Sequence, residues 1–310
     1  MDEPLLLHSL AEHAELIFGA LAAARPASIV EIGSETGGFS KELMTWAGEN
    51  GATLSTVEPF PTPELRELDR VVGHFNLVAA RSPAALAAID PADAYVIDGD
   101  HNYWTVLREL EAAYAGANRP LAILHDICWP SGRRDLYYDP NSVPEEERQT
   151  YSYEKAAHPD HDELVDTGGF HGDHYFAAAE KQGGERNGVL TAVEDFLRDR
   201  PDLALRKLPV VFGVGFVFPD DAPWAGRVKE LLDPWHESRM AQRIERNRVQ
   251  LYVRVLELQE EMRRVGMRAS RASLDLEDRL EELEAENAAL RLERQRLRAR
   301  LAGNGVVEPQ

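Results

Sequence analysis

Short apolar runs alternate with amphipathic stretches between residues 5 and 124. Helical spacing of the apolar residues predicts a helix over residues 5–24, which Pro26 ends. Apolar runs of four or five residues predict buried strands, and the amphipathic stretches between them predict helices. The predicted strands are 28–32, 53–57, 76–80, 94–97 and 121–124, and the predicted helices are 41–48 and 102–115. This order is typical of an α/β fold with a doubly wound, Rossmann-like parallel sheet.

The alternation stops at Asp126 and resumes only near residue 189. Residues 127–187 are rich in Pro, Gly, His, Asp and Tyr and show no long periodic run, which predicts an insertion. Residues 189–198 have helical spacing again. Two apolar runs, 203–208 and 211–218, follow so closely that we expect a hairpin, with an antiparallel last strand in the sheet.

The C-terminal region has the heptad pattern of a coiled coil. Leucine occupies the d positions 276, 283, 290 and 297, and the a positions hold Leu280, Asn287, Arg294 and Leu301. An Asn at an a position favours a parallel two-stranded coil and fixes its register. A parallel pair would also bring opposite charges together at Arg279–Glu284, Glu286–Arg291 and Glu293–Arg298. We therefore expect a parallel homodimer through residues 276–301, with a solvated single helix as the alternative.

A second apolar seam precedes the first one. Val265 and Leu276 are separated by a heptad plus four residues, a stutter with Gly266 at the shift. This upstream seam either packs on the α/β domain or continues the coil. Its members are Ile244, Leu251, Val255, Leu258, Met262 and Val265.

Charge and composition divide the chain into segments. The net charge is −20, but residues 241–302 hold 14 basic and 12 acidic residues and are slightly positive. Glycine and proline nearly vanish after residue 240 until Gly303. The expected organisation is an N-terminal helix (1–24), an α/β domain (25–220, with the insertion 127–187), a linker (221–240), a coiled-coil segment (241–302) and a disordered tail (303–310).

The same composition argues against several classes of protein. A strongly acidic chain is a poor partner for nucleic acids and for anionic membranes. Cys128 is the one cysteine, so an intramolecular disulfide is excluded. The acidic N-terminus does not resemble a signal peptide, and apolar runs are too short to span a bilayer. These features favour a cytoplasmic location.

A glycine-rich turn follows the first predicted strand, from Gly33 to Gly38. Glycines at such a turn let the backbone approach a ligand at a helix N-terminus. The dinucleotide fingerprint would need glycine at position 35, where this chain has Glu35, whose carboxylate would repel a pyrophosphate. Glu58 ends the second strand, where an acid can accept both ribose hydroxyls. A nucleotide cofactor without phosphates, such as S-adenosylmethionine, fits these residues; an ordinary tight turn beside a solvated acid is the alternative.

The pattern Glu31-x-Gly33-x-x-x-Gly37, with Glu58 and Asp98 at later strand ends, resembles the class I S-adenosylmethionine-dependent methyltransferases over roughly residues 25–218. The resemblance implies a methyltransferase sheet and an enzyme that uses S-adenosylmethionine. It also implies cofactor contacts at Glu31, Gly33, Ser34, Gly37, Glu58, Ser82 and Asp98.

Asp98 and Asp126 end the fourth and fifth strands, whose carboxyl ends open onto one crevice in a parallel sheet. This arrangement resembles metal-dependent O-methyltransferases of catechol and caffeoyl type, and the macrocin O-methyltransferase and cephalosporin-hydroxylase-like branch. The resemblance implies that Asp98 and Asp126 bind a divalent metal (Mg, Mn or Fe), and His125 is the third candidate ligand. His101 is the candidate catalytic base, and Asp98 is the second candidate catalytic residue. In the alternative interpretation, Asp98 and Asp100 cap the following helix.

The insertion carries two histidine pairs, His158/His161 and His171/His174, each at i, i+3 spacing. Four such histidines could bind zinc, although an acidic, partly exposed loop explains the same residues. Its aromatic residues can stack on rings or sugars, and Arg133 and Arg134 could offset the acidic cleft or hold an anionic acceptor. We expect the insertion to form the acceptor-binding lid.

Three functions follow from these features. The first is metal-assisted O-methylation of a small molecule or glycan with S-adenosylmethionine. The second keeps the fold but performs cephalosporin-hydroxylase-like chemistry, against which stands the lack of a clear set of two histidines and one carboxylate outside the insertion. The third is a non-enzymatic dimeric scaffold with a degenerate cofactor domain.

Overall fold

A computed structural model describes residues 6–34, 37–172 and 174–303 of the chain. Two compact units divide it, Met1–Leu256 and Glu257–Gln310. The first unit holds the sheet and the predicted site residues, and the second consists mainly of the continuation of one long helix. Among the described residues, no helix combines the length and apolarity that crossing a membrane requires.

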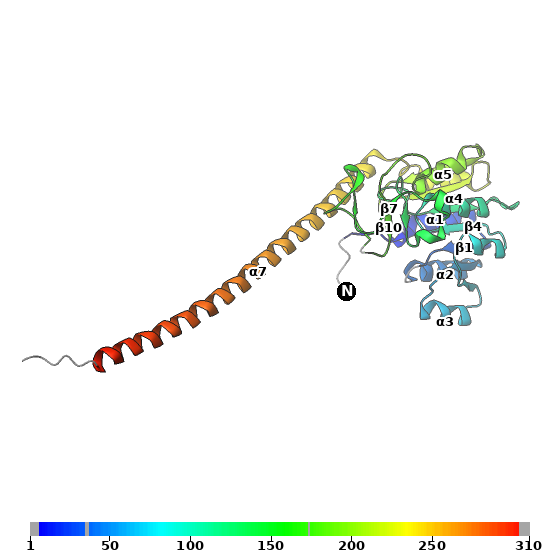
Figure 1. Cartoon of the computed structure of the whole chain (residues 1–310). Coiled ribbons are helices and arrows are strands. Elements are labelled where there is room, and N and C mark those ends of the chain that lie inside the picture. Colours follow the sequence, from blue (N-terminus) through cyan, green and yellow to red (C-terminus); the bar gives the residue numbers. More distant parts are fainter. Residues whose placement is uncertain (1–5, 35–36, 173, 304–310) are drawn as a thin grey trace, which may run out of the picture. The chain divides into compact units, whose positions relative to one another are not determined.

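Seven strands form the central sheet in the order β11-β12-β5-β4-β1-β2-β3. Figure 1 labels β1 and β4 of this sheet among the surrounding helices. Strands β3, β2, β1, β4 and β5 pair in parallel, whereas β12 runs antiparallel to β5 and β11 antiparallel to β12. This topology confirms the predicted doubly wound sheet with an antiparallel last strand. The bounds are β1 Ser28–Ile32, β2 Thr53–Val57, β3 Phe75–Val78, β4 Ala94–Ile97, β5 Leu121–Leu124, β11 Leu203–Leu208 and β12 Val214–Pro219.

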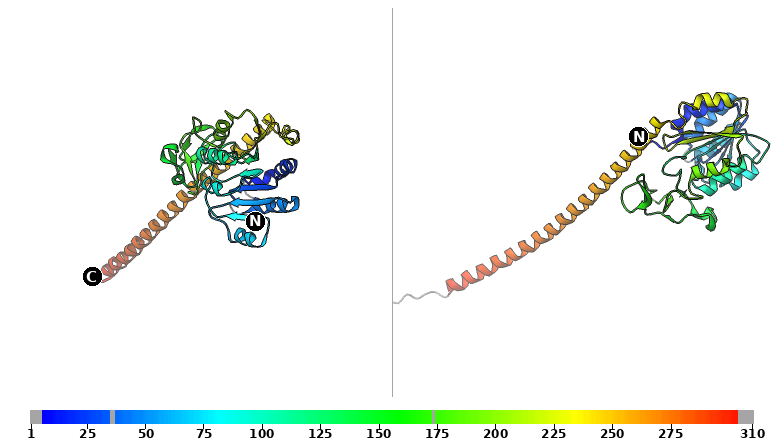
Figure 2. Two further views of the ribbon diagram at one scale, coloured as in Figure 1. Left: turned by 90° about the vertical axis from the view of Figure 1, so that its right-hand side faces the viewer. Right: turned by 90° about the horizontal axis from the view of Figure 1, so that it is seen from above.

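Helices cover both faces of the sheet (Figure 2). Four helices contribute to the core on one face: α1 (Ala14–Ala24), α2 (Gly38–Asn50), α3 (Pro63–Val71) and α6 (Ala225–Leu232). The opposite face is covered by α4 (Tyr103–Ala113) and α5 (Val189–Leu197). Short 3-10 helices precede α1 (η1, Leu10–His13) and β4 (η2, Ala84–Ala88).

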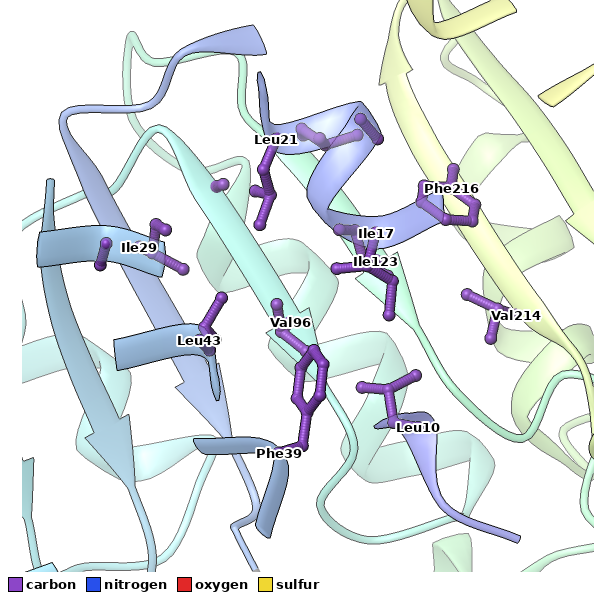
Figure 3. Packing of buried hydrophobic residues seen from close by; sticks show 14 of the residues in the cluster. Leu10, Ile17, Leu21, Ile29, Phe39, Leu43, Val96, Ile123, Val214 and Phe216 are labelled. Carbon is purple, nitrogen blue, oxygen red and sulfur yellow. The ribbon is translucent and has the colours of Figure 1, made fainter. Parts of the chain in front are cut away.

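Figure 3 shows the core on the first face, where Ile17 and Leu21 of α1 meet Phe216 of β12, Ile123 of β5 and Val96 of β4. All five side chains are fully buried. Removing so much apolar surface from water is the main term that stabilises the sheet and its helices. The central strands β4, β5 and β12 are buried at every residue, which explains why they read as continuous apolar runs in the sequence.

Several elements differ from the prediction. The stretch 5–24 is η1 followed by α1, rather than one helix, and α2 begins at Gly38. The sequence analysis missed α3, although Thr62 caps it by accepting a hydrogen bond from the Leu65 amide and Pro63 occupies its first turn. Strand β12 starts at Val214 because Val211, Phe212 and Gly213 all have positive φ angles.

The expected linker over residues 221–240 is wrong. It contains α6, whose Val228 and Leu232 are fully buried in the core beside α1. The helix is short and is flanked by aspartate and tryptophan residues, so its amphipathic pattern is difficult to recognise in the sequence. The helix is therefore part of the α/β domain and not a connection.

The insertion after β5 is folded rather than a plain loop. A three-stranded sheet joins β6 (Leu136–Tyr137), β10 (Ala177–Ala179) and β7 (Tyr151–Ser152), and β8 (Ala156–His158) pairs with β9 (His161–Val165). The 3-10 helices η3 (Pro140–Ser142) and η4 (Glu145–Glu147) lie between β6 and β7.

Two buried charged side chains hold the insertion: Asp135 connects it to α4 and α5, and Arg134 links segments within it. The Asp135 carboxylate accepts hydrogen bonds from the amides of Tyr103 and Gly188, at the starts of α4 and α5. Arg134 is fully buried and donates to the carbonyls of Ala179 and Asp162. Arg134 therefore stabilises the insertion, and the expectation that it holds an anionic acceptor is wrong.

Helix α7 runs from Arg239 to Gly303, and its first turns belong to the first unit. Ala241, Glu245, Val249 and Val253 form a buried face at spacing of four residues. Residues 241–302 are helical, as expected, but the helix continues the first unit as far as Leu256.

The upstream seam lies on another face of α7. Ile244 and Leu251 are 59% and 58% exposed, so the α/β domain does not cover them. In the second unit the d-position leucines are exposed as well. The a-position side chain of Leu301 lies outside the described residues, as does the expected tail apart from Gly303, the last residue of α7.

Candidate functional site

The turn after β1 brings the backbone of two strand ends into close contact. Gly33 has a φ of +84°, and a Cβ atom there would lie 2.3 Å from the Asp98 carbonyl oxygen. Any larger residue would therefore push β1 and β4 apart. Ser34 follows, and its amide and hydroxyl donate to Oε2 of Glu58 at 3.1 and 3.3 Å. Glu35, on which the argument against a dinucleotide rests, lies outside the described residues.

Glu31 is buried at the end of β1 beneath this turn. Its carboxylate accepts hydrogen bonds from the hydroxyls of Thr56 and Ser40 at 2.7 and 2.9 Å. Burial raises the pKa of Glu31 to about 7 despite these hydrogen bonds. Glu31 therefore fixes the position of the turn on α2 and β2.

Ser82 lies in a different environment from the one predicted. Its hydroxyl donates to the carboxyl of Glu109 on α4, and Ser82 does not belong to the cavity lining described below. Glu109 is fully buried, and its second carboxyl oxygen has no hydrogen-bond partner among the described residues. Burial raises the pKa of Glu109 to about 8.

This buried acid makes stability depend on pH. Because the folded state keeps Glu109 protonated, the protein is expected to lose stability as pH rises from about 4.5 to about 8. Glu109→Gln, which keeps the shape without the charge, should be more stable than the parent by on the order of 4 kcal/mol at pH 8 and equal to it near pH 4. Urea unfolding at both pH values measures this difference, and an equal difference at the two would contradict it.

The ends of β4 and β5 bring three metal-ligating side chains together. Asp98, His101 and Asp126 each offer one ligand atom within 4.8 Å of the other two. The Nε2 atom of His101 lies 3.1 Å from Oδ2 of Asp126. Oδ1 of Asp126 is buried, and none of the described residues forms a hydrogen bond with it. Two carboxylate oxygens and one imidazole nitrogen suit a divalent cation, and an unpartnered buried oxygen is the feature that such a cation would satisfy.

His125 does not join this group, contrary to the prediction that it is a metal ligand. Its Nδ1 lies 3.0 Å from Oδ1 of Asp98, and its Nε2 lies 3.1 Å from the Val211 carbonyl oxygen. Burial alone would lower its pKa, but the carboxylates of Asp98 and Asp126 outweigh it and raise the pKa of His125 to about 9. With both ring nitrogens occupied, His125 orients Asp98, and His101 takes its place beside the carboxylates.

The alternative that Asp98 and Asp100 cap α4 is wrong. Asn102 is the N-cap, and its side chain accepts a hydrogen bond from the Thr105 amide. Asp100 accepts hydrogen bonds from the Asn102 side chain and the Tyr138 amide, and burial raises its pKa to about 6. Asp98 is therefore left to face His125 and the cavity.

A cavity of about 680 Å³ contains the three side chains of this cluster. Gly33, Ser34 and Glu31 also line it, so the predicted cofactor turn and the predicted metal site share one space. Gly37 and Glu58 lie outside the lining, although Ser34 connects Glu58 to it. The insertion contributes Tyr138, Phe170, His171, Tyr175 and Phe176 to the wall.

The histidine pairs of the insertion do not form a metal group with three or more ligands among the described residues, where Asp98, His101 and Asp126 form the only one. The rings of His158 and His161 lie 4.7 Å apart, and the Asp160 amide donates to Nδ1 of His158. Arg133 pairs with Glu194 on α5 and does not line the cavity. The acidic-loop interpretation thus accounts better for these residues than a zinc site.

Sequence reasoning missed the contribution of α7 to this site. The Glu245 carboxylate accepts hydrogen bonds from the amides of Val211 and Phe212 at 3.1 and 3.0 Å. Arg248 binds both oxygens of that carboxylate and also donates to the Leu7 carbonyl. The turn that holds the Val211 carbonyl against His125 is therefore fixed by α7. The apolar seam seen in the sequence lies on the exposed face of α7, whereas Glu245 and Arg248 lie on the side that contacts the α/β domain.

Comparison with known proteins gives one family match. Residues 30–126 match the family model described as a methyltransferase domain. The matched segment runs from β1 to Asp126 and includes the glycine turn, Glu58 and Asp98. The match is consistent with the methyltransferase family predicted from the sequence. No curated protein matches the chain.

Several solved structures are similar. A methyltransferase of Podospora anserina bound to S-adenosylhomocysteine is 16% identical, with 67% of this chain and 78% of that chain covered and a TM-score of 0.40. The O-methyltransferase TomG of Streptomyces achromogenes, involved in tomaymycin synthesis, is 15% identical, with 68% and 82% covered and a TM-score of 0.39. An O-methyltransferase of Bacillus cereus is 13% identical, with 69% and 84% covered and a TM-score of 0.40.

Proposed function

We propose that this chain, whose residues 30–126 match the model of a methyltransferase domain, is a class I S-adenosylmethionine-dependent, metal-assisted O-methyltransferase acting on a small-molecule or glycan hydroxyl. The observation that carries the proposal is the cavity itself. It joins the glycine turn at Gly33 and Ser34 to the cluster of Asp98, His101 and Asp126.

Different residues would bind the cofactor, bind the cation and position the ligands of the cation. The close packing of Gly33 on Asp98 holds the cofactor turn against β4, and Glu58 fixes Ser34 at its rim. A divalent cation at Asp98, His101 and Asp126 would lower the pKa of an acceptor hydroxyl, and S-adenosylmethionine would supply the methyl group. His125 keeps Asp98 in position through its hydrogen bond at 3.0 Å. A carboxylate of the cluster would accept the hydroxyl proton.

His101 can serve in one of two roles. As a ligand it would use the nitrogen near Asp126, and as a base it would take the acceptor proton directly. We favour the ligand role, because its Nε2 atom lies 3.1 Å from Oδ2 of Asp126. Chelation separates the roles: turnover that survives removal of divalent cations supports the base role.

The hydroxylase alternative fits the donor set less well. Non-haem iron oxygenases typically use two histidines and one carboxylate, whereas this cluster has one histidine and two carboxylates. His125 does not complete that set, because both its nitrogens are hydrogen-bonded to protein groups.

Cofactor binding is the most direct test. Glu58→Ala is expected to weaken S-adenosylmethionine binding about ten- to a hundredfold, because charge-assisted hydrogen bonds to the ribose and the support of Ser34 are both lost. Isothermal titration calorimetry measures the affinity. Glu49→Ala, an exposed acid in the last turn of α2, is the matched control and should bind normally. An unchanged affinity in folded Glu58→Ala would remove Glu58 from the site, and a parent chain that does not bind would favour the scaffold alternative.

For the second unit, our proposal is a parallel homodimer through residues 276–301. Its support is the exposed leucine stripe of α7 together with the charge pairs that a parallel partner would meet. The exposed Ile244 and Leu251 leave room for the coil to begin further upstream.

A further inference from the structure

The turn before β12 has a backbone conformation that most residues avoid. Val211 and Phe212 have φ angles of 47° and 61°, in the left-handed region, and Gly213 follows at 85°. Glycine adopts such angles readily, whereas a β-branched side chain such as that of Val211 makes them costly. A strained turn of this kind persists only where neighbouring groups hold it. The turn over residues 211–213 therefore depends on hydrogen bonds to the structure around it.

The carbonyl groups of this turn bind the segment that carries Asp126. Each of the three carbonyls of residues 211–213 accepts one hydrogen bond from that segment. The donors are Nε2 of His125 at 3.1 Å, the Ile127 amide at 3.3 Å and the Cys128 amide at 2.7 Å. Asp126 lies between these donors and itself has a left-handed φ of 59°. The turn therefore fixes the bend in the chain that carries the Asp126 carboxylate.

Glu245 on α7 binds the amide groups of the same turn. Its buried carboxylate accepts hydrogen bonds from Val211 and Phe212 at 3.1 and 3.0 Å, and Arg248 binds both of its oxygens. Burial would raise the pKa of Glu245, but the hydrogen bonds from Arg248 and the two amides outweigh it and lower the pKa. An ionised acceptor forms stronger hydrogen bonds than a neutral one. Glu245 is therefore a strong restraint on the turn.

We propose that Glu245 is a positioning residue for the candidate metal site, an inference that rests on the proposed function. It holds the turn over residues 211–213, and the turn holds the bend at Asp126. The same turn reaches Asp98 through His125, whose Nδ1 lies 3.0 Å from Oδ1 of Asp98. Glu245 is not among the described residues that line the cavity, so its effect passes through the turn. The family match ends at Asp126, and α7 supplies this support from outside the matched segment.

Glu245→Gln tests the proposal, because it keeps the size of the side chain and removes the charge. The new amide group would place a donor against a backbone amide or Arg248, so the turn should lose a hydrogen bond. In full-length protein freed of divalent cations, calorimetric titration with Mn²⁺ is expected to show binding about tenfold weaker than in the parent. The affinity for S-adenosylhomocysteine should stay nearly unchanged, because its predicted contacts at Gly33, Ser34 and Glu58 follow other strands.

Two further variants show whether the carboxylate acts through the turn. Glu260→Gln is the matched control, because it breaks a surface ion pair with Arg264 on the same helix and should alter neither affinity. Val211→Gly removes the side chain that the left-handed conformation disfavours and keeps the carbonyl that binds His125. Combined with Glu245→Gln, it should bring the Mn²⁺ affinity back to within about threefold of the parent value.

An unchanged Mn²⁺ affinity in folded Glu245→Gln would overturn the proposal. An equal loss of Mn²⁺ and S-adenosylhomocysteine binding would also overturn it, because such a loss indicates a general loss of structure. The same holds if Val211→Gly restores no Mn²⁺ binding, since the carboxylate would then act by another route. If Glu245→Gln does not fold, Glu245→Asp, which keeps the charge on a shorter side chain, is measured by the same criteria.

The parent protein separates this inference from the proposed function. A parent that binds Mn²⁺ but not S-adenosylhomocysteine would contradict the proposed function, and the effect of Glu245 on the metal site would stand. A parent that binds no Mn²⁺ would contradict both the metal-assisted reaction and the positioning role. A parent that binds both, with Mn²⁺ affinity unaffected by Glu245→Gln, would overturn the positioning role alone.

Discussion

Asp126→Asn is expected to lower the rate of methyl transfer by about a hundredfold or more while leaving the affinity for S-adenosylmethionine nearly unchanged. Asp126 has a φ of 59°, a conformation that asparagine tolerates as readily as aspartate, so the backbone should not change. The substitution removes one charge from the cluster and one oxygen that a cation would bind. Initial rates at saturating cofactor measure the loss of activity. Calorimetric titrations measure the affinity for the cofactor and the affinity for Mn²⁺, which should fall.

Asp221→Asn is the matched control for this experiment. Asp221 is an exposed carboxylate paired with Arg119 on the surface, and its loss should change neither rate nor affinity. Asp98→Asn should lower both the rate and the cofactor affinity, because Asp98 also contacts His125 and packs its backbone on Gly33. Full activity of Asp126→Asn, or of the parent protein after chelation, would show that the reaction does not need the cation.

Ending the chain after Leu256 is expected to convert a dimer into a monomer that keeps its catalytic rate per chain. The truncation removes the exposed leucines of residues 276–301, whose burial between two helices would drive association. Sedimentation equilibrium at micromolar concentration reports the mass. A chain ended after Gly303 is the control and should remain dimeric. A full-length chain that sediments as a monomer at tens of micromolar would contradict the proposal.

The position of the truncation matters because α7 serves both units. A chain ended after Pro234 would also lose Glu245, Arg248 and Tyr252, and with them the support of the turn at Val211 and Phe212. We expect that shorter chain to lose activity and stability together. Asn287→Leu, by contrast, should make the coil more stable while admitting trimers or tetramers, because a buried Asn selects two strands.

The sequence determined the sheet, the glycine turn and the two carboxylates. Parallel strands that are buried on both faces are apolar along most of their length. The order of apolar runs in the sequence therefore predicts the order of strands and helices. The placement of Asp98 and Asp126 followed from the rule that strands of one sheet open their carboxyl ends on the same edge. Local signals of this kind need no knowledge of distant contacts.

Only the tertiary structure decided which histidine joins the carboxylates and what surrounds them. In the sequence, His101 and His125 cannot be told apart as ligands, because each lies within three residues of an aspartate. In the structure, the Val211 carbonyl forms a hydrogen bond with Nε2 of His125, so this nitrogen is not available to a metal. The helix α6 and the buried face of α7 were hidden because their burial depends on packing against α1 and against the turn before β12. Arg134 and Asp135 look like surface charges in the sequence, and they are buried because backbone groups from distant segments satisfy them. His125 and Val211 are more than 80 residues apart in the sequence. Such a contact depends on the path of the chain in space, which the local pattern of residues does not specify.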